Sequence, residues 1–243
     1  MKSIIISADY KEDIDALSTG HRHSHHGRSD LLAHAPVRDE EMLSLLRALQ
    51  LTMPHKSHWT IGIISTLHGE GVSSIARGLA RIVSRTPSAK VLICDVAGDP
   101  RTRPSSQRSN STALATRASY DVGEGRIEFT WLPGTQVAIG VLGDSGGMTS
   151  ITHDVEAMRH MLSSVSDSFE LTILDLPPVS ESIVGPAIAK ALDGVVLVVE
   201  AERTRTAAVQ ASQRTIKMHG GNVLGVVLNK RRFHIPNFIY RRL

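Results

Sequence analysis

The sequence has one cysteine, no long apolar run and little net charge, and each of these shortages excludes a class of protein. Cys94 has no second cysteine to pair with, and its place inside an apolar run indicates a small buried side chain. No stretch approaches the roughly 18 apolar residues that a membrane-spanning helix needs. The apolar core near the N-terminus is too short for a secretory signal. The formal net charge of +3 is too small to indicate nucleic-acid binding. We therefore expect a cytoplasmic protein with no nucleic-acid partner.

Length and composition describe a globular chain. The 243 residues are enough for one large domain or two small ones. Hydrophobic residues make up 41% of the chain and charged residues 21%, so the apolar content is sufficient for a sizeable core.

From about Trp59 onward, the sequence alternates between strand-like runs and helix-like segments. Several runs are continuously apolar, which is typical of strands buried on both faces of a parallel sheet. The alternation indicates an α/β fold with a doubly wound, mostly parallel sheet flanked by helices. The predicted strands are Thr60–Ser65, Val91–Asp95, Ile127–Leu132, Val137–Leu142, Leu171–Asp175, Val195–Glu200 and Val223–Asn229. The predicted helices lie near Ser73–Arg85, Thr152–Val165, Ile183–Leu192 and Thr206–His219.

Polar residues follow several of the predicted strands. Asp95, Asp175 and Asn229 each end an apolar run, and the segment Gly69–Ser74 follows the first strand. In doubly wound sheets, ligands bind beyond the carboxyl ends of the strands. We therefore expect these residues to meet at one ligand site.

The segment Gly69–Ser74 joins a β-branched run to a helix of small and apolar residues. This pattern predicts a phosphate-binding loop, whose backbone N–H groups and helix N-terminus face an anion. Such loops usually end in Gly-Lys-Ser/Thr, where the lysine reaches the outer phosphates and the hydroxyl holds Mg²⁺. Here Val72 takes the lysine position and Ser73 keeps the hydroxyl. The loop is therefore predicted to lack its main cation.

The N-terminal part is predicted to be less regular. Residues 1–38 are polar and lack sustained periodicity, which favours a disordered segment. Its histidine cluster, within Gly20–Gly27, fits either a transition-metal site or a solvated linker, and the linker is favoured because no cysteine or carboxylate completes a site. Residues 39–56 are predicted to form a helix and linker, because acidic residues occupy the first turn and an apolar stripe follows at helical spacing.

Residues 57–229 are predicted to form a P-loop ATPase-like domain, followed by a basic and aromatic tail at 230–243. Within the domain, residues 101–125 are rich in Ser, Thr and Arg and predict a mobile loop. The tail fits either an anionic membrane face or a docking partner. Pro236 interrupts any continuous helix, so the docking partner is favoured.

Five segments, in this order and spacing, resemble those of one protein family. They are Ser65–Ser73, Val91–Asp95, Leu174–Val179, Asp193–Val199 and Val223–Asn229. Together they resemble the bacterial tyrosine autokinases of polysaccharide synthesis and export, which are relatives of the septum-positioning and partition ATPases with deviant Walker motifs. The Asp-Leu-Pro-Pro-Val sequence at 175–179 is especially telling, because the family has Asp-x-Pro-Pro-Val there. The resemblance runs from about Glu40 to the C-terminus.

The resemblance implies that ATP or ADP binds together with Mg²⁺. The nucleotide-binding residues that it implies are Gly69, Glu70, Gly71, Val72, Ser73, Ser74 and Asn229. Asn229 is similar to the asparagine that contacts the adenine edge in related ATPases, but an ordinary turn residue also fits that position. Glu70 also fits a simply solvated side chain.

The same resemblance implies catalytic roles for Asp95 and Asp175, and a metal site at Ser73 and Asp175. Capping of strand ends is the alternative interpretation of the two aspartates, and the nearby glycine loop favours the site. Tyr240 is the candidate phosphate acceptor, although its flanking arginines equally suit a structural anchor.

The departures from the family pattern concern mostly charged positions. Val72 replaces the lysine of the loop, and Ala97 replaces the second aspartate of the second Walker-type motif. In the oligomerisation motif Glu-x-x-Arg-x-x-Arg, Glu41 and Arg47 match but Ser44 replaces the first arginine. The tail has a single tyrosine where the family has a cluster. Because phosphoryl transfer depends on positioning and charge neutralisation, we expect a poor kinase or none.

Besides a purely structural scaffold with an inactive pocket, three functions remain open at this point. The favoured one is a catalytically impaired member of the family that regulates an inner-membrane polysaccharide copolymerase, lies at the membrane through that partner and forms a possible homo-oligomer. The second is an active ATP-dependent tyrosine autokinase that uses Tyr240 and a substitute cation. The third is a partition-type ATPase switch.

Overall fold

An eight-stranded sheet forms the centre of the structure, a computed structural model that describes residue 32 and residues 37–53, 55–96, 117–122, 125–144 and 155–231. The strands are β1 (Trp59–Ser65), β2 (Val91–Asp95), β3 (Arg117–Val122), β4 (Gly125–Trp131), β5 (Val137–Asp144), β6 (Leu171–Asp175), β7 (Gly194–Glu200) and β8 (Val223–Asn229). They lie in the order β3-β4-β5-β2-β6-β1-β7-β8. Neighbours from β5 to β8 pair in parallel, whereas β4 runs antiparallel to β5 and to β3. The predicted fold class is confirmed.

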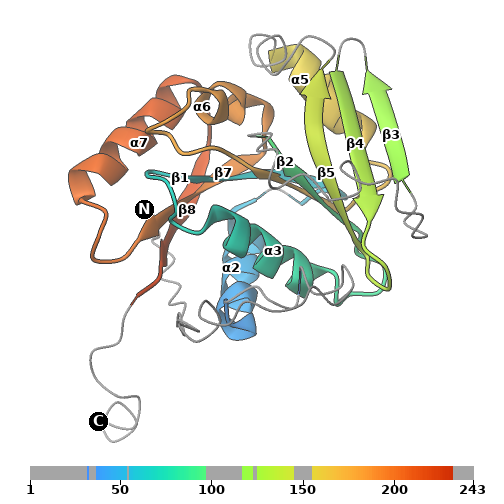
Figure 1. Cartoon of the computed structure of the whole chain (residues 1–243), viewed down its shortest axis with the longest axis horizontal. Coiled ribbons are helices and arrows are strands. Elements are labelled where there is room, and N and C mark those ends of the chain that lie inside the picture. Colours follow the sequence, from blue (N-terminus) through green and yellow to red (C-terminus); the bar gives the residue numbers. More distant parts are fainter. Residues whose placement is uncertain are drawn as a thin grey trace, which may run out of the picture.

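Helices cover both faces of this sheet. They are α2 (Asp39–Thr52), α3 (Val72–Val83), α5 (Val155–Ser164), α6 (Val184–Ile188) with the 3₁₀ turn η3 (Ala189–Ala191), and α7 (Thr206–Met218). Helices α2 and α3 lie on one face, and α5, α6 and α7 lie on the other (Figure 1). Among the described residues, none of the helices is long and apolar enough to cross a bilayer.

The strands supply two hydrophobic cores because successive side chains point to opposite faces. Ile61 and Ile63 of β1 pack in the core beneath α2 and α3, whereas Ile64 packs in the core beneath α5, α6 and α7. Cys94 lies in the second core and is fully buried, as predicted. Burial, together with the charge of Asp95, raises the pKa of its thiol to about 12, so the group stays a neutral thiol.

Two sequence predictions need correction. Residues 117–122, predicted to belong to a mobile loop, form the edge strand β3 instead. Pairing with β4 stabilises this strand, and pairing of that kind is invisible in a Ser- and Arg-rich composition. The helix predicted at 183–192 is the short α6 followed by η3, because the last turn tightens to 3₁₀ geometry. Residues 101–116 lie outside the described residues.

Most of the predicted disordered segment, including its histidine cluster, also lies outside the described residues. Leu32 and Val37, however, are buried in the core beneath α2 and α3. Arg81 of α3 donates from Nη1 to the Leu32 carbonyl at 2.9 Å and from Nη2 to the Val37 carbonyl at 2.8 Å. The same guanidinium pairs with Asp39 at 2.8 Å. The ordered packing therefore begins before the predicted boundary at residue 39.

Candidate functional site: a glycine loop above two carboxylates

The glycine loop lies between the end of β1 at Ser65 and the start of α3 at Val72. Gly69 and Gly71 have φ angles of 79° and 97°, in the left-handed region that side chains disfavour. A Cβ on Gly71 would also lie 2.2 Å from Nδ2 of Asn229. Glycine at position 71 is therefore required both by backbone conformation and by space.

The backbone N–H groups of the loop are available to an anion. Within the part of the chain that the structure describes, no acceptor is found for the N–H groups from Gly69 to Ser74. The flanking amides do have partners: Leu67 donates to the Glu70 carboxylate at 2.7 Å, and Ile75 donates to the Gly71 carbonyl at 3.1 Å. A run of unpaired N–H groups at a helix N-terminus is the arrangement that binds phosphate.

Glu70 is fully buried, so the interpretation of a solvated side chain is wrong. Its carboxylate accepts hydrogen bonds from three donors: the N–H of Leu67, the N–H of Glu200 at 3.1 Å and the hydroxyl of Thr204. The carboxylate thus ties the loop to the segment between β7 and α7. The main-chain atoms of Glu70 belong to the loop, while its buried side chain binds the loop to neighbouring elements.

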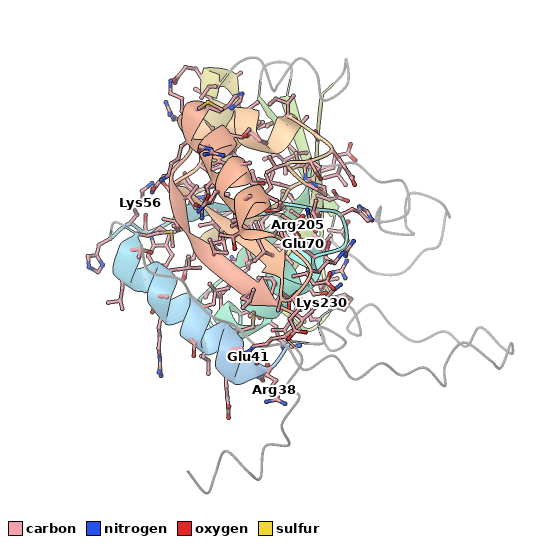
Figure 2. The ribbon with its side chains drawn as sticks, turned by 90° about the vertical axis from the view of Figure 1, so that its left-hand side faces the viewer. Arg38, Glu41, Lys56, Glu70, Arg205 and Lys230 are labelled. Carbon is pink, nitrogen blue, oxygen red and sulfur yellow. The ribbon has the colours of Figure 1, made fainter. Side chains whose placement is uncertain are left out.

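The end of β8 supports the loop from a second direction. Nδ2 of Asn229 donates to the Glu70 carbonyl at 2.8 Å, and Nζ of Lys230 donates to the Gly69 carbonyl at 2.7 Å. Asn229 is buried, and Figure 2 shows Lys230 and Glu70 close together. The sequence analysis places Lys230 at the start of the predicted tail. The sequence feature that could have indicated this contact is the position of Lys230 directly after Asn229, which ends a strand at the edge of the sheet where the loop lies.

Glu200 pairs with two cationic side chains beside the loop, those of Arg203 and Lys230. Its Oε2 accepts from Arg203 at 2.9 Å and lies 3.4 Å from Nζ of Lys230. Burial raises the pKa of Glu200, but hydrogen bonds and charges from Arg203 and Lys230 outweigh that effect and hold this pKa below its usual range.

Asp95 and Asp175 meet at the carboxyl ends of neighbouring strands, as predicted, because they are register partners in the parallel pair β2 and β6. Burial is the main reason that the pKa of Asp175 is raised to about 6, and the charge of Asp95 raises it further. A hydrogen bond from Ser73 and the charge of Arg77 act in the opposite direction. Arg77 was not predicted, although its place one helical turn after Ser73 is visible in the sequence.

Val72 occupies the lysine position without any contribution of charge. Its side chain is only 8% exposed and belongs to the hydrophobic core beneath α2 and α3. The position that carries the phosphate-binding cation in other loops is therefore part of the apolar core here. Ala97 and Tyr240 lie outside the described residues.

The site combines unpaired amides, a hydroxyl and two carboxylates. Amides of this kind bind phosphate oxygens, and hydroxyl and carboxylate oxygens are the ligands that Mg²⁺ prefers. Among the described residues, no group of three or more His, Cys, Asp and Glu side chains could hold a metal by itself. A metal here would depend on oxygens from a bound phosphate.

Comparisons with known proteins show which proteins the chain is similar to. No family model matches the chain. It is 33% identical over 70 residues to the tyrosine-protein kinase CpsD of Streptococcus agalactiae, which is 29% of this chain and 31% of that protein. It is 26% identical over 183 residues to the succinoglycan biosynthesis transport protein ExoP of Rhizobium meliloti, which is 70% of this chain and 22% of that protein. The chain thus spans less than a third of the length of these curated relatives.

Among solved structures, the kinase domain of the Escherichia coli tyrosine kinase ETK shares the fold. The TM-score is 0.67 at 16% identity, and the match covers 97% of this chain and 94% of that domain. At this identity the structural match concerns the fold, and the sequence matches and ordered motifs carry the relationship. On these grounds, the chain resembles the exopolysaccharide-related bacterial tyrosine autokinases in its sequence and shares the fold of a kinase domain of that kind.

Proposed function

We propose that this chain is a catalytically impaired, tyrosine-kinase-like P-loop domain that regulates a membrane polysaccharide copolymerase during exopolysaccharide synthesis or export. The observation that carries the proposal is the buried Val72 at the position of the phosphate-binding lysine. A valine there cannot neutralise the charge that develops on a transferred phosphoryl group. Loss of a comparable cation, an arginine finger, costs on the order of 10³–10⁵ in rate.

The other charges near the loop do not replace that lysine. Lys230 contacts the carbonyl of Gly69, which points away from the N–H of Glu70 in the same peptide unit. The charge of Arg77 acts on the half-buried Asp175. Four carboxylates also lie in or beside the site, from Glu70, Asp95, Asp175 and Glu200. These features support weak binding of a nucleotide rather than efficient phosphoryl transfer.

The proposal assigns ATP or ADP to the amides of Gly69–Ser74, with the side chains of Ser73, Asp95 and Asp175 beside its Mg²⁺. When bound, Mg²⁺ supplies positive charge that offsets the phosphates. The unpaired amides and the oxygen-rich donor set fit this pair of ligands. An active autokinase would need Tyr240 as acceptor and a cation in place of Val72, and a partition-type switch would need the same cation.

The proposed partner follows from the relatives. ExoP is by its name a transport protein of succinoglycan biosynthesis, and the chain matches 22% of its length. By this likeness we propose a membrane polysaccharide copolymerase as the partner of this chain. Helix α2 offers a contact surface for that partner or for a second copy, because Leu51 is 81% exposed and Leu43 is 38% exposed on it.

The test measures ADP and ATP binding by calorimetry with Mg²⁺, and phosphate incorporation on tyrosine, for the wild type, Val72→Lys and Val72→Met. We expect no tyrosine phosphorylation by the wild type, and tighter nucleotide binding by Val72→Lys alone. The methionine variant controls for the volume of the longer side chain. Wild-type tyrosine phosphorylation that Val72→Lys does not increase would overturn the proposal, because the missing cation would then have no consequence.

A further inference from the structure

We propose that Asn229 and Lys230 are positioning residues that hold the glycine loop in its anion-binding conformation before any ligand arrives. The inference rests on the proposed function in so far as that function assigns phosphate groups to the loop. We propose this role for Asn229 in place of the contact with the adenine edge that the resemblance implies. We call Glu70, Asn229 and Lys230 the loop clamp.

The argument starts from the geometry of the peptide bond. In a planar trans peptide, the carbonyl of one residue and the N–H of the next point in opposite directions. Lys230 holds the carbonyl of Gly69 at 2.7 Å, and Asn229 holds that of Glu70 at 2.8 Å. These bonds therefore fix the directions of the next two N–H groups, those of Glu70 and Gly71. Both N–H groups have no acceptor among the described residues.

The carboxylate of Glu70 prevents the loop from turning over. It accepts from the N–H groups of Leu67 and Glu200, which lie in the first part of the loop and at the end of β7. A rotation of the peptide units around Glu70 would leave these part-buried N–H groups and the buried carboxylate without partners, and unpaired buried polar groups are costly. The side chain and the carbonyl of Glu70 are thus bound at the same time to β7 and β8.

Asn229 also explains the second glycine of the loop. A Cβ at position 71 would lie 2.2 Å from Nδ2 of Asn229, so the amide nitrogen occupies the space beside Gly71. Asn229 is 3% exposed, and its amide is directed to the loop carbonyl. In this position the amide of Asn229 contacts the loop on the side of the Glu70 carbonyl.

Lys230 is held in place at the cost of backbone strain. Its φ angle is 54°, in the left-handed region that non-glycine residues adopt rarely and only where their surroundings determine it. Glu200 lies 3.4 Å from its ammonium and Arg203 binds the same carboxylate oxygen. The ammonium is therefore directed to the Gly69 carbonyl by a defined set of neighbours.

Support of this kind has a clear use in a loop without a lysine. When a site lacks a cation, its affinity for an anion depends on N–H dipoles that are already aligned, because alignment on binding would cost free energy. A side-chain donor on each of these two loop carbonyls, an ammonium on Gly69 and a neutral amide on Glu70, also polarises the peptide and strengthens its N–H as a donor. The clamp thus compensates in part for Val72.

The experiment uses the full chain, with hydrogen exchange followed at the amides of Leu67 and Ile75 and with pyrophosphate as the probe in calorimetry. The variants are Asn229→Ala and Lys230→Asn. The latter removes the ammonium but keeps a residue that tolerates a left-handed backbone. Lys230→Arg tests rescue by a longer cation, and Lys217→Asn on α7 is the exposed control.

We expect faster exchange at Leu67 and Ile75 and a pyrophosphate affinity lowered by about five- to tenfold in both clamp variants, as for one lost hydrogen bond to a loop carbonyl. Exchange in β4, far from the loop, should stay unchanged, and Lys230→Arg should restore most of the affinity. Unchanged exchange at Leu67 and Ile75 in both variants would overturn the proposal. If the wild type does not bind pyrophosphate but the exchange still changes, the clamp stands and nucleotide binding by the proposed function fails.

Discussion

Asn229 fills the space that a side chain at position 71 would need, with its amide nitrogen 2.2 Å from the place of that Cβ. Gly71→Ala should therefore lower the free energy of unfolding by more than the roughly 1–2 kcal/mol expected for left-handed strain alone. Gly134→Ala is a matched control, because Gly134 also has a positive φ but nothing lies within 4 Å of its Cβ position. Urea unfolding of both variants gives the comparison. Equal losses in the two would contradict the steric argument.

The buried carboxylate of Glu70 gives the second prediction. Glu70→Gln keeps the shape of the side chain but replaces one acceptor oxygen by an amide that cannot accept from the N–H of Leu67 or Glu200. We expect a loss of about 1–3 kcal/mol in the free energy of unfolding, since a buried donor is left without a partner. Glu40→Gln, at an exposed position on α2, should change stability little. Denaturant titration of the two variants would refute the prediction if their midpoints coincide.

The raised pKa of Asp175 predicts a dependence of stability on pH. The folded pKa of about 6 lies above 3.8, the ordinary pKa of an aspartate. Between these values the folded state holds a proton that the unfolded state releases, so stability falls as the pH rises from about 4 to 6. Asp175→Asn removes the buried charge and should stabilise the fold at pH 7 by on the order of 2 kcal/mol, with the gain lost below about pH 4.

Urea unfolding at pH 4 and pH 7 tests this prediction, with Asp167→Asn as a control at an exposed position. A gain for Asp175→Asn that is the same at both pH values would show that burial of the ionised carboxylate is not its cause. If Asp167→Asn raised the free energy of unfolding by the same amount, the change in net charge would explain the stabilisation.

The exposed Leu51 predicts how the proposed partner binds. Leu51→Asp should abolish co-purification with the proposed membrane copolymerase, because a charge replaces an 81% exposed apolar side chain on α2. Met218→Asp on α7 is the control, since Met218 is 77% exposed but lies on a helix that covers the other face of the sheet. Equal capture of the two variants would exclude α2 as the contact surface.

The sequence predicts the parallel strands well because their apolar runs are continuous and their ends carry polar residues. The prediction that Asp95 and Asp175 lie close together is therefore correct, and so is the predicted position of the glycine loop. The edge strand β3 is missed because its stability comes from pairing with β4, which no local pattern records. The burial of Glu70 is missed for a similar reason, since its partners Glu200 and Thr204 are more than a hundred residues away in the chain. The role of Lys230 is missed because its partner is the backbone carbonyl of Gly69, far away in the chain, and a backbone carbonyl leaves no mark in the sequence.

Arg81 gives the last prediction, because one guanidinium joins α3 to the segment that precedes α2. It binds the carbonyls of Leu32 and Val37 and the carboxylate of Asp39. Arg81→Met should keep the packing of the stem but leave buried carbonyls unpaired, with a loss of about 2 kcal/mol in the free energy of unfolding. Proteolysis between residues 32 and 39 should become faster, while Arg214→Met at an exposed position on α7 leaves it unchanged. Cleavage at the wild-type rate in Arg81→Met would mean that apolar burial of Leu32 and Val37 is enough to hold the segment.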